Sequence, residues 1–372
     1  MRIIHLADLH LGKMLHQASL IDIQKELLEQ ITDYIKTHKI DAIILAGDIY
    51  DRSIPPLEAV HLLNSFLSCL INECHLKVYM ISGNHDSSER LDFGSEILEK
   101  QGLYIETHLH HKIPFIQQEN VRFYMLPYSK PIDFKMLDET SPISSYQEAL
   151  AYYMNKQDID SAYTNILITH HFVGHTSRIS ESEVSIGIGG SEIIDPHLFE
   201  SFDYVALGHL HTPQYVLNEK IRYSGSLYKY SFSEANSTKG FIIYDTESHL
   251  IENILLCPSR DVQVYQGYYK EFMNLDFIKK KDDYLSIELL DHEIIPHAIE
   301  HLKMLYPYLL KLTYPSLINE KAIVDRSIDK MKSLQTIDLY KDFYQNVSGQ
   351  PLDEEKEKIM RDVLGGINNE AA

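Results

Sequence analysis

The 372-residue sequence contains no tryptophan and only three cysteines, Cys69, Cys74 and Cys257. Three cysteines without a CxxC pair exclude a disulfide framework and a zinc ribbon, so reduced thiols are expected. No apolar run approaches the roughly 20 residues that a membrane-spanning helix requires, and we expect no membrane association. The first ten residues, MRIIHLADLH, include an aspartate and two histidines where a signal peptide would be apolar, which favours a cytoplasmic protein.

Basic residues are also scarce. The chain has 34 Lys and Arg against 54 Asp and Glu, which gives a formal net charge of −20 at pH 7 and a pI near 5.4. Such a surface opposes tight binding of nucleic acid, whose phosphates attract basic proteins. Residues 1–256 carry 19 basic and 34 acidic side chains, and residues 257–372 carry 15 and 20. If this chain acts on DNA, we expect it to bind duplex weakly by itself.

Short apolar segments alternate with longer helical ones through the first 85 residues. The pattern predicts strands at 3–7, 42–46 and 78–82, with helices at 20–38 and 56–73 between them. This order is typical of a parallel sheet covered by helices, and therefore of an α/β fold.

The rest of the chain predicts a second sheet and two smaller parts. Packed on the first sheet, the second is expected to use strands at 121–127, 166–169, 204–207, 221–223 and 241–244, with a helix at 146–155. A small α/β module should follow, with strands at 262–268, 284–289 and 308–313 and a helix at 295–306. Helical spacing with a charged run resumes at 337–364. We therefore predict three domains, at 1–256, 257–335 and 336–372.

Polar clusters follow five of the predicted strands at their carboxyl ends. In chain order they are Asp8-Leu9-His10, Gly47-Asp48-Ile49-Tyr50-Asp51, Gly83-Asn84-His85-Asp86, Thr169-His170-His171 and Gly208-His209-Leu210-His211. Open α/β sheets place ligand sites at this end of the strands, so the clusters should converge on one rim. Mixed carboxylate, imidazole and amide donors suit divalent manganese, iron, zinc or magnesium. Two metals that share a carboxylate can clamp a phosphoryl group during in-line attack.

This ordered set resembles the calcineurin-like metallophosphoesterase superfamily over residues 1 to about 256, which implies a four-layer αββα sandwich. The resemblance implies two metals that share Asp48, the first also bound by Asp8, His10 and His211, and the second by Asn84, His170 and His209. It further implies that His85 lies beside the substrate phosphate and that Asp51 orients His85. His170 and His171 compete for one ligand position, and His170 is favoured because it directly follows its strand.

The residues around the metal motifs narrow the resemblance to the SbcD family, the nuclease subunits of bacterial SbcC–SbcD DNA repair complexes. Five segments carry this similarity: DIYDRSIPP at 48–56, GNHDSSERLDFGS at 83–95, GGSEIIDP at 189–196, FDYVALGHLHTPQ at 202–214 and RYSGSLYKYSFSE at 222–234. Protein phosphatases are expected to show GDxxDRG and GNHE instead. Here Arg52 is followed by Ser53, and the second motif ends in Asp86.

The SbcD resemblance implies a metal-dependent enzyme that hydrolyses DNA phosphodiesters, with His85 assisting a metal-activated water. It implies ATP-dependent double-strand exonuclease and single-strand endonuclease activity in DNA repair, recombination and replication, on ends, hairpins and single strands. Two divalent ions are implied, manganese in preference to magnesium. The basic residues in loops beside the motifs are candidate DNA contacts, namely Lys13, Arg52, Arg90, Arg178, Lys229 and Lys239.

The same resemblance implies protein partners and roles for the smaller domains. Residues 257–335 are similar to the capping domain of the family, and the helical segment 336–372 corresponds to the part that grips an SbcC-type ATPase. The apolar helices at 56–73 and 88–100 are expected to form a two-fold homodimer within a heterotetramer.

Two other functions remain as alternatives. A stand-alone phosphoesterase acting on small nucleotides or phosphoproteins would need neither the added module nor the C-terminal helix. A non-catalytic scaffold for an ATPase would retain a metal site, but its ligand positions would be free to change, and here none is lost.

Overall fold

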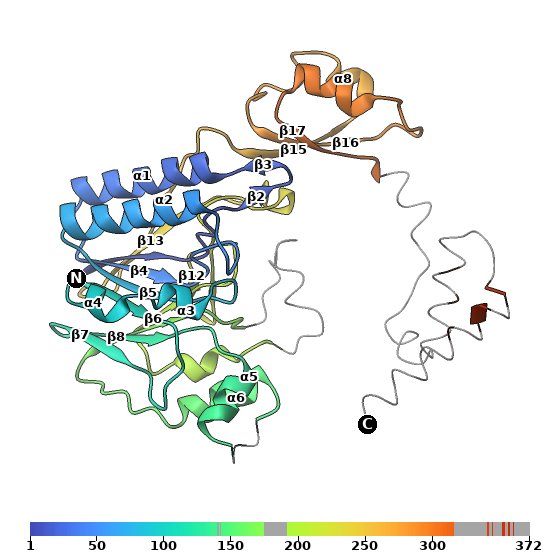
Figure 1. Cartoon of the computed structure of the whole chain (residues 1–372). Helices are drawn as coiled ribbons and strands as arrows, with labels where there is room; N and C mark the ends of the chain where they lie inside the picture. Colours follow the sequence, from blue (N-terminus) through green and yellow to red (C-terminus); the bar gives the residue numbers. More distant parts are fainter. Residues whose placement is uncertain are drawn as a thin grey trace. The chain divides into compact units, whose positions relative to one another are not determined.

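The computed structural model of the protein describes residues 1–139, 141, 143–174 and 192–315, together with residues 341, 344, 352, 353, 356, 357 and 360. The chain divides into two compact units, Met1–Thr313 and Tyr314–Ala372. The first unit contains two six-stranded sheets, the helices that cover them and a smaller three-stranded sheet (Figure 1).

The first sheet has the strand order β14-β13-β1-β4-β5-β6. Its parallel strands are β1 (Arg2–Leu6), β4 (Ala42–Ala46), β5 (Lys77–Ile81) and β6 (Leu103–Glu106). Strand β13 (Gly240–Asp245) pairs antiparallel with β1, and β14 (Ile251–Leu255) pairs with β13 at the edge. The prediction that residues 241–244 belong to the second sheet is therefore wrong. A strand that is buried on both faces shows no alternation, so its sequence does not reveal which sheet it joins.

The second sheet has the strand order β11-β12-β10-β9-β8-β7. Its central strands are parallel: β8 (Val121–Leu126), β9 (Thr164–Thr169), β10 (Tyr204–Leu207) and β12 (Asn218–Tyr223). Antiparallel strands lie at the two edges, β7 (Phe115–Gln118) and β11 (Gln214–Val216). The predicted second sheet is confirmed, although the short edge strands β6, β7, β11 and β14 were not foreseen.

Helices cover the outer face of each sheet, which gives the four αββα layers that were predicted (Figure 1). On the first sheet lie α1 (Ile21–Thr37) and α2 (Leu57–Ser68), and α2 continues as a π-helical turn over Cys69–Glu73. On the second sheet lie α5 (Pro131–Leu137) and α6 (Tyr146–Met154). The predicted helix at 88–100 is split into α3 (Ser88–Leu91) and α4 (Ser95–Glu99), because Gly94 between them takes a left-handed φ of 80°.

Aromatic residues fill much of the space between the two sheets. Tyr79 stacks on Phe123 with ring centroids 3.8 Å apart, and Tyr204 stacks on Tyr244 at 4.3 Å. Burying a side chain of this size stabilises the fold by about 1.5–3 kcal/mol. This layer holds the two sheets in a fixed relation, so the loops at their carboxyl ends can define a rigid site.

The small module consists of a parallel three-stranded sheet, β15 (Val262–Gly267), β16 (Tyr284–Leu289) and β17 (Leu309–Thr313), with α7 (Tyr269–Phe272) and α8 (Ala298–Leu305). It contacts the sandwich where Tyr228 donates a hydrogen bond to the Arg260 carbonyl at 2.8 Å. The division into three domains stays a prediction, and most of 336–372 lies outside the described residues. Among the described residues, no helix has both the length and the apolar character needed to cross a membrane.

Candidate metal centre

Five loops bring the predicted ligands together at the carboxyl ends of the parallel strands. They follow β1, β4, β5, β9 and β10, and they carry Asp8, His10, Asp48, Asn84, His170, His209 and His211. All of these side chains are buried except that of Asn84, which is partly exposed. Residues as far apart in the sequence as Asp8 and His211, 203 positions, therefore form one polar cluster.

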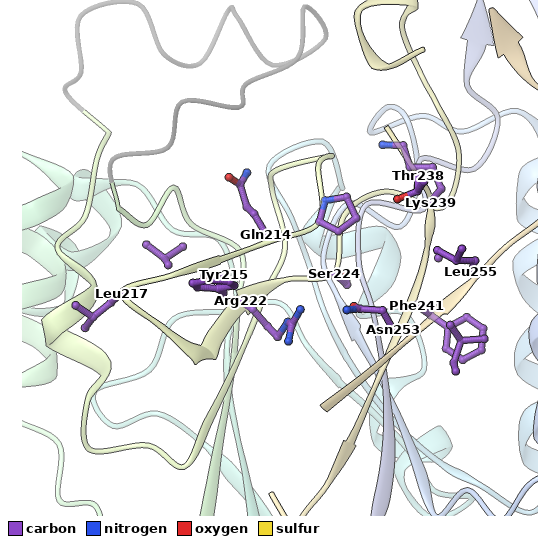
Figure 2. A pocket seen from close by; sticks show the side chains of 14 residues that line it. Gln214, Tyr215, Leu217, Arg222, Ser224, Thr238, Lys239, Phe241, Asn253 and Leu255 are labelled. Atoms are coloured by element: carbon purple, nitrogen blue, oxygen red, sulfur yellow. The ribbon is translucent and has the colours of Figure 1, made fainter. Parts of the chain in front are cut away.

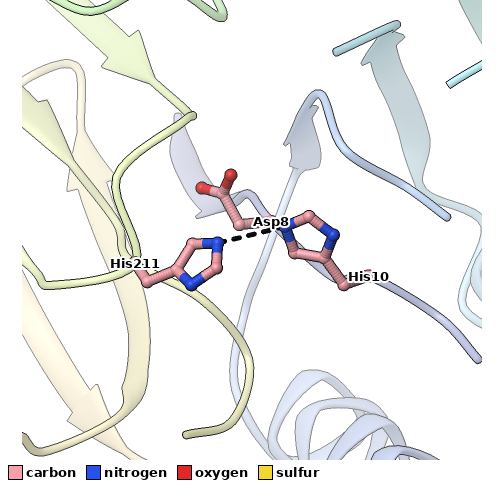
Figure 3. A group of neighbouring side chains, drawn as sticks. All are labelled: Asp8, His10 and His211. Atoms are coloured by element: carbon pink, nitrogen blue, oxygen red, sulfur yellow. Dashed lines mark hydrogen bonds between the residues drawn. The ribbon is translucent and has the colours of Figure 1, made fainter. Parts of the chain in front are cut away.

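The first group of donors consists of Asp8, His10 and His211, whose ligand atoms lie within 4.8 Å of one another (Figure 3). The Nε2 atoms of His10 and His211 are 3.1 Å apart. The Asp8 carboxylate accepts the backbone N–H of His209, at 2.9 and 3.1 Å from its two oxygens. This contact ties the loop after β1 in the first sheet to the loop after β10 in the second.

The second group consists of Asp8, Asp48 and His170, whose ligand atoms also lie within 4.8 Å of one another. Asn84 adjoins this group, because its Oδ1 lies 3.1 Å from Nε2 of His170 and 3.0 Å from Nδ1 of His209. The amide oxygen and the imidazoles therefore face a common point, as ligands of one metal would.

Asp48 lies between the two groups. Its Oδ2 is 3.5 Å from Nε2 of His10 and 3.3 Å from Nε2 of His170, while its Oδ1 accepts the backbone N–H of His85 at 2.9 Å. A carboxylate that faces both imidazole sets is the ligand type that bridges two ions. Carboxylate, imidazole and amide donors in these numbers fit two divalent metal ions.

The charges of the cluster depend on one another. Burial raises the pKa of Asp8 to about 6, although the imidazoles of His170 and His211 oppose the rise. Burial also acts to raise the pKa of Asp48, but His170 and His10 outweigh it and hold that pKa well below its usual range. Burial disfavours a charged His170, yet the adjacent Asp48 outweighs it and raises the pKa of His170 to about 9. Positive charge, from protons on the histidines or from metal ions, therefore stabilises the ionised carboxylates of this cluster.

The backbone around the cluster is strained in a way that places the ligands. Asp8, His10, Asp48 and His209 all have positive φ, between 41° and 104°, which non-glycine residues rarely adopt. Gly83 is required for a different reason, because a Cβ there would lie 2.2 Å from Oδ1 of Asp48. The loops can therefore approach so closely only with glycine at this position.

His85 and Asp51 lie beside the ligands. Nδ1 of His85 donates to the backbone carbonyl of Asp51 at 2.9 Å, so the contact between the two residues uses the main chain of Asp51. The Asp51 carboxylate instead forms an ion pair with Nζ of Lys13 at 2.7 Å and lies 3.8 Å from Nδ1 of His10. The hydrogen bond between His85 and residue 51 therefore uses the Asp51 carbonyl and not its side chain, and a role of Asp51 in orienting His85 stays a prediction.

The structure separates the two histidines that competed for one position. His170 faces Asp48 and Asn84, and its Nδ1 donates to the Ala46 carbonyl at 2.8 Å. His171 turns away, with its Nδ1 2.9 Å from the Thr169 hydroxyl and its Nε2 near the main chain of Ser129. This geometry supports His170 as the ligand.

Three further residues support the ligand loops, and of these only Asp86 stands in one of the predicted polar clusters. Gln24 is buried on α1, where its amide donates to the carbonyls of Leu9 and His10 at 3.1 and 2.8 Å. Asp86 accepts three backbone N–H groups, those of Ile49, Tyr50 and Gly83. The signal for Gln24 was present in the sequence, as a polar residue on the apolar side of a helix.

Glu234 is the third such residue, and it contacts a metal ligand directly. Its Oε1 lies 3.5 Å from Nδ1 of His211, and its Oε2 lies 2.6 Å from Nζ of Lys239. Lys239 also donates to the His211 carbonyl at 2.6 Å. Burial would raise the pKa of Glu234, but the charge of Lys239 outweighs it, so the carboxylate remains ionised. A carboxylate on Nδ1 fixes the tautomer in which Nε2 of His211 can bind a metal.

We expect Glu234→Gln to weaken manganese binding by about 10- to 100-fold, because the amide no longer orients His211 as a charged acceptor. Manganese titration monitored by calorimetry measures the change. Glu252→Gln is the matched control, since Glu252 is paired with Arg2 at 3.0 Å on an edge strand away from the ligands. Equal manganese affinity of the Glu234 variant and the unmodified protein would contradict this role.

The candidate DNA contacts differ in their surroundings. Arg52 and Arg90 are exposed near the site, and Arg178 lies outside the described residues. Lys13 is paired with Asp51, and Lys239 is buried on Glu234. Lys229 is also buried, with Nζ 2.7 Å from the Ala235 carbonyl and 2.9 Å from Asp261. This placement argues against a DNA contact for Lys229, because its ammonium already links the sandwich to the small module.

Comparisons with known proteins agree with this arrangement. The family model described as calcineurin-like phosphoesterase matches residues 1–213, and the one described as type 5 capsule protein repressor C-terminal domain matches residues 258–348. The chain is 35% identical over 373 residues to the SbcD subunit of the nuclease SbcCD from Staphylococcus epidermidis, covering 99% of each chain. It is 34% identical to the SbcD subunit of the same nuclease from Staphylococcus saprophyticus, covering 100% of each.

A solved structure of a dimetal phosphatase from Danio rerio also matches, with a TM-score of 0.36 and 12% identity over 70% of this chain and 99% of the other. The fold, the two donor groups and the match over residues 1–213 define the class of the protein, which is a calcineurin-like phosphoesterase. Within that class, full-length identity of 34–35% shows that the chain belongs to the SbcD family.

Proposed function

We propose that the protein is a metal-dependent nuclease that hydrolyses DNA phosphodiester bonds as the SbcD component of an SbcC–SbcD complex. The observation that carries the proposal is the convergence of seven ligand side chains from five loops, in a chain that matches SbcD nucleases over its whole length. Manganese is the proposed metal, bound at two positions that would share Asp48, because its carboxylate faces both His10 and His170. Double-strand ends, hairpins and single strands are the proposed substrates, cleaved in the cytoplasm during repair, recombination and replication.

His85 is proposed to serve the leaving oxygen of the substrate. Asp8, His10, Asp48, Asn84, His170, His209 and His211 would hold two divalent ions, which would supply polarisation of the phosphate and activation of a water. Because Nδ1 of His85 donates to the Asp51 carbonyl, Nε2 is the nitrogen that can exchange a proton with substrate. An imidazolium held in this way can donate that proton to the departing 3′ oxygen.

An ATPase partner is proposed because the chain by itself is poorly suited to hold DNA. The net charge is −20, and three of the candidate basic contacts are engaged within the fold, Lys13, Lys229 and Lys239. We propose that an SbcC-type subunit binds residues 336–372 and supplies most of the DNA affinity, while residues 257–335 act as a capping domain.

One experiment tests the proposed function against its alternatives. The protein is incubated with manganese and a linear duplex with labelled ends, with and without an SbcC-type ATPase and ATP. End-directed degradation that the ATPase stimulates is the expected result. Hydrolysis of a nitrophenyl phosphate ester without any attack on DNA would favour a stand-alone phosphoesterase. Bound manganese without activity on either substrate would favour a scaffold.

A homodimer is proposed from the apolar surface of the helices at 56–73 and 88–100. The large apolar side chains exposed there are Leu57, Val60, Phe93 and Ile97, with Ile54 just before the first helix, and Phe93 is 87% and Ile97 72% exposed. Exposed apolar groups of this size in neighbouring segments are typical of a protein interface. A second copy of this chain, related by a two-fold axis, is the proposed occupant.

We expect the double substitution Phe93→Asp and Ile97→Asp to convert the dimer into a monomer, because it places two charges where apolar surfaces would meet. Light scattering coupled to size-exclusion chromatography measures the mass. Ile132→Asp on α5, which removes another exposed apolar side chain, should leave the dimer intact. A monomeric unmodified protein, or a double variant that remains dimeric, would contradict the proposal.

A further inference from the structure

A cavity of about 690 Å³ opens at the edge of the sandwich, and none of the predicted metal ligands lines it. One wall is formed by β11 and β12, which carry Tyr215 and Arg222, and by Ser224 directly after β12 (Figure 2). The other wall is formed by β13 and β14 and carries Asn253 and Leu255. Its volume is in the range of sites that hold small organic molecules.

The cavity continues the layer between the two sheets. Arg222 is in register with Ala206, and Asn253 with Ile242, so side chains of both strands point into this layer. Ala206 belongs to the core between the sheets, and the stacked rings of Tyr204 and Tyr244 lie in the same core. Elsewhere apolar side chains fill this layer. Between β12 and β14 it contains the charged side chain of Arg222 and the cavity.

Arg222 carries a charge for which the described part of the fold provides no partner. The residue is only 8% exposed, its Nε has no hydrogen-bond partner, and no ion pair or hydrogen bond of its side chain occurs among the described residues. No carboxylate among those residues lines the cavity, although the chain as a whole is strongly acidic. Lys239 lines it as well, but its ammonium is bound to Glu234 and to the His211 carbonyl.

The charge of Arg222 also affects the neighbouring His5, which is buried inside the sandwich. Burial lowers the pKa of His5 to about 3, and the positive charge of Arg222 contributes to that shift. Nδ1 of His5 lies 3.0 Å from the Tyr204 hydroxyl, while its Nε2 is buried without a partner in the described structure. His5 therefore offers Arg222 no negative charge from this direction.

Arg122, on β8 of the same sheet, differs from Arg222 because its charge is compensated by neighbouring groups. Its guanidinium lies 3.6 Å from the centroid of the Tyr163 ring and 3.7 Å from the Asp160 carboxylate. Burying a charge without such compensation costs free energy, so buried charges are normally paired. The cavity therefore leaves the charge of Arg222 uncompensated, and an anion bound from solution would compensate it.

We propose that this cavity binds a phosphate-bearing ligand of mononucleotide size, with its phosphate on Arg222 and its planar ring against Tyr215. The planar fork of a guanidinium suits two oxygens of one phosphate. Tyr215 is in register with Arg222 on the adjacent strand and is 60% exposed, so its ring is available for stacking. The site is separate from the metal centre, and the proposal does not depend on the nuclease function.

Calorimetric titration of the full-length protein in a metal chelator tests this proposal, because phosphate cannot then bind through metal ions. The probes are deoxyadenosine monophosphate, inorganic phosphate and deoxyadenosine. We expect the nucleotide to bind, inorganic phosphate to bind more weakly, and deoxyadenosine not to bind. Failure of the nucleotide to bind would overturn the proposal. Equally tight binding of deoxyadenosine, or of inorganic phosphate, would overturn the assignment of a nucleotide.

Two variants locate the ligand. Arg222→Met should weaken binding of the nucleotide on the order of tenfold or more, since a charge-assisted hydrogen bond is lost. It should not lower the melting temperature, because an apolar side chain replaces a buried unpaired charge. Tyr215→Ala, at an exposed position, should weaken the nucleotide about tenfold and leave inorganic phosphate unchanged. Arg122→Met is the control and should bind like the unmodified protein. Unchanged nucleotide binding by Arg222→Met would overturn the proposal.

Discussion

Asp48→Asn should abolish manganese-dependent hydrolysis of DNA, with a loss of about a thousandfold or more in rate. The asparagine keeps an oxygen for the His85 amide, so the loops after β4 and β5 can stay joined. What it removes is the negative charge at the atom that lies 3.5 Å from His10 and 3.3 Å from His170. Without that charge, the carboxylate proposed to bridge the two metals is lost, and both metals should bind weakly.

Two measurements separate the loss of metal from a loss of fold. Manganese should raise the melting temperature of the unmodified protein, because a ligand that binds only the native state stabilises it. The Asp48→Asn variant should show little or no such rise while remaining folded in chelator. Glu29→Gln, a change of an exposed carboxylate on α1, should behave like the unmodified protein in both assays. Full hydrolytic activity of Asp48→Asn would show that Asp48 does not bridge the metals.

The predicted ligands come together in the fold for a physical reason. Each candidate directly follows an apolar strand, and the carboxyl ends of parallel strands meet at one edge, so local patterns sufficed to bring Asp8, Asp48 and His170 together. Gln24 is marked in the sequence as a polar residue on the apolar side of a helix, but the partners of Gln24 and Glu234 are decided by contacts made in the folded chain. Gln24 contacts Leu9 across 15 residues, and Glu234 contacts His211 across 23. Neither partner is marked by the residues around it.

The sheet that β13 joins and the environment of Lys229 could not be predicted from the sequence for the same reason. The residues of β13 are almost all buried, so nothing in their pattern distinguishes the first sheet from the second. Lys229 was predicted to be a candidate DNA contact in a loop beside the motifs. In the fold its stem is buried, and its ammonium is bonded to Asp261, which lies 32 residues further along the chain. The sheet that β13 joins depends on the topology, and the burial of Lys229 depends on its long-range ion pair. Neither can be read from local patterns in one sequence.

The ion pairs of the candidate DNA-binding lysines bear on how this acidic chain could bind DNA. Of the six candidate DNA contacts, Arg52 and Arg90 are exposed, whereas Lys13, Lys229 and Lys239 are engaged with Asp51, Asp261 and Glu234. Few of the candidate cations are thus available for phosphates, which supports the proposal that a partner supplies most of the DNA affinity. Tight duplex binding by the isolated chain that persists at high salt would contradict it.

His85→Ala should lower the rate of DNA cleavage by about 10²- to 10⁴-fold, the usual contribution of a positioned general acid. Manganese binding should be retained, because the ligand atoms belong to other residues and the contact of His85 with Asp48 uses its backbone N–H, which alanine keeps. This result is the opposite of that expected for Asp48→Asn, so the two variants together distinguish a ligand from a residue that serves the substrate.

The nature of the leaving group provides the decisive comparison. If His85 donates a proton to the departing 3′ oxygen, a nitrophenyl phosphodiester should be hydrolysed by His85→Ala almost as fast as by the unmodified protein, because nitrophenolate leaves without a proton. If His85 only shapes the turn that carries Asn84, both substrates should be slowed equally and manganese affinity should fall as well, since Asn84 lies 3.1 Å from His170 and 3.0 Å from His209. The ratio of the two rates therefore measures proton donation apart from the integrity of the site.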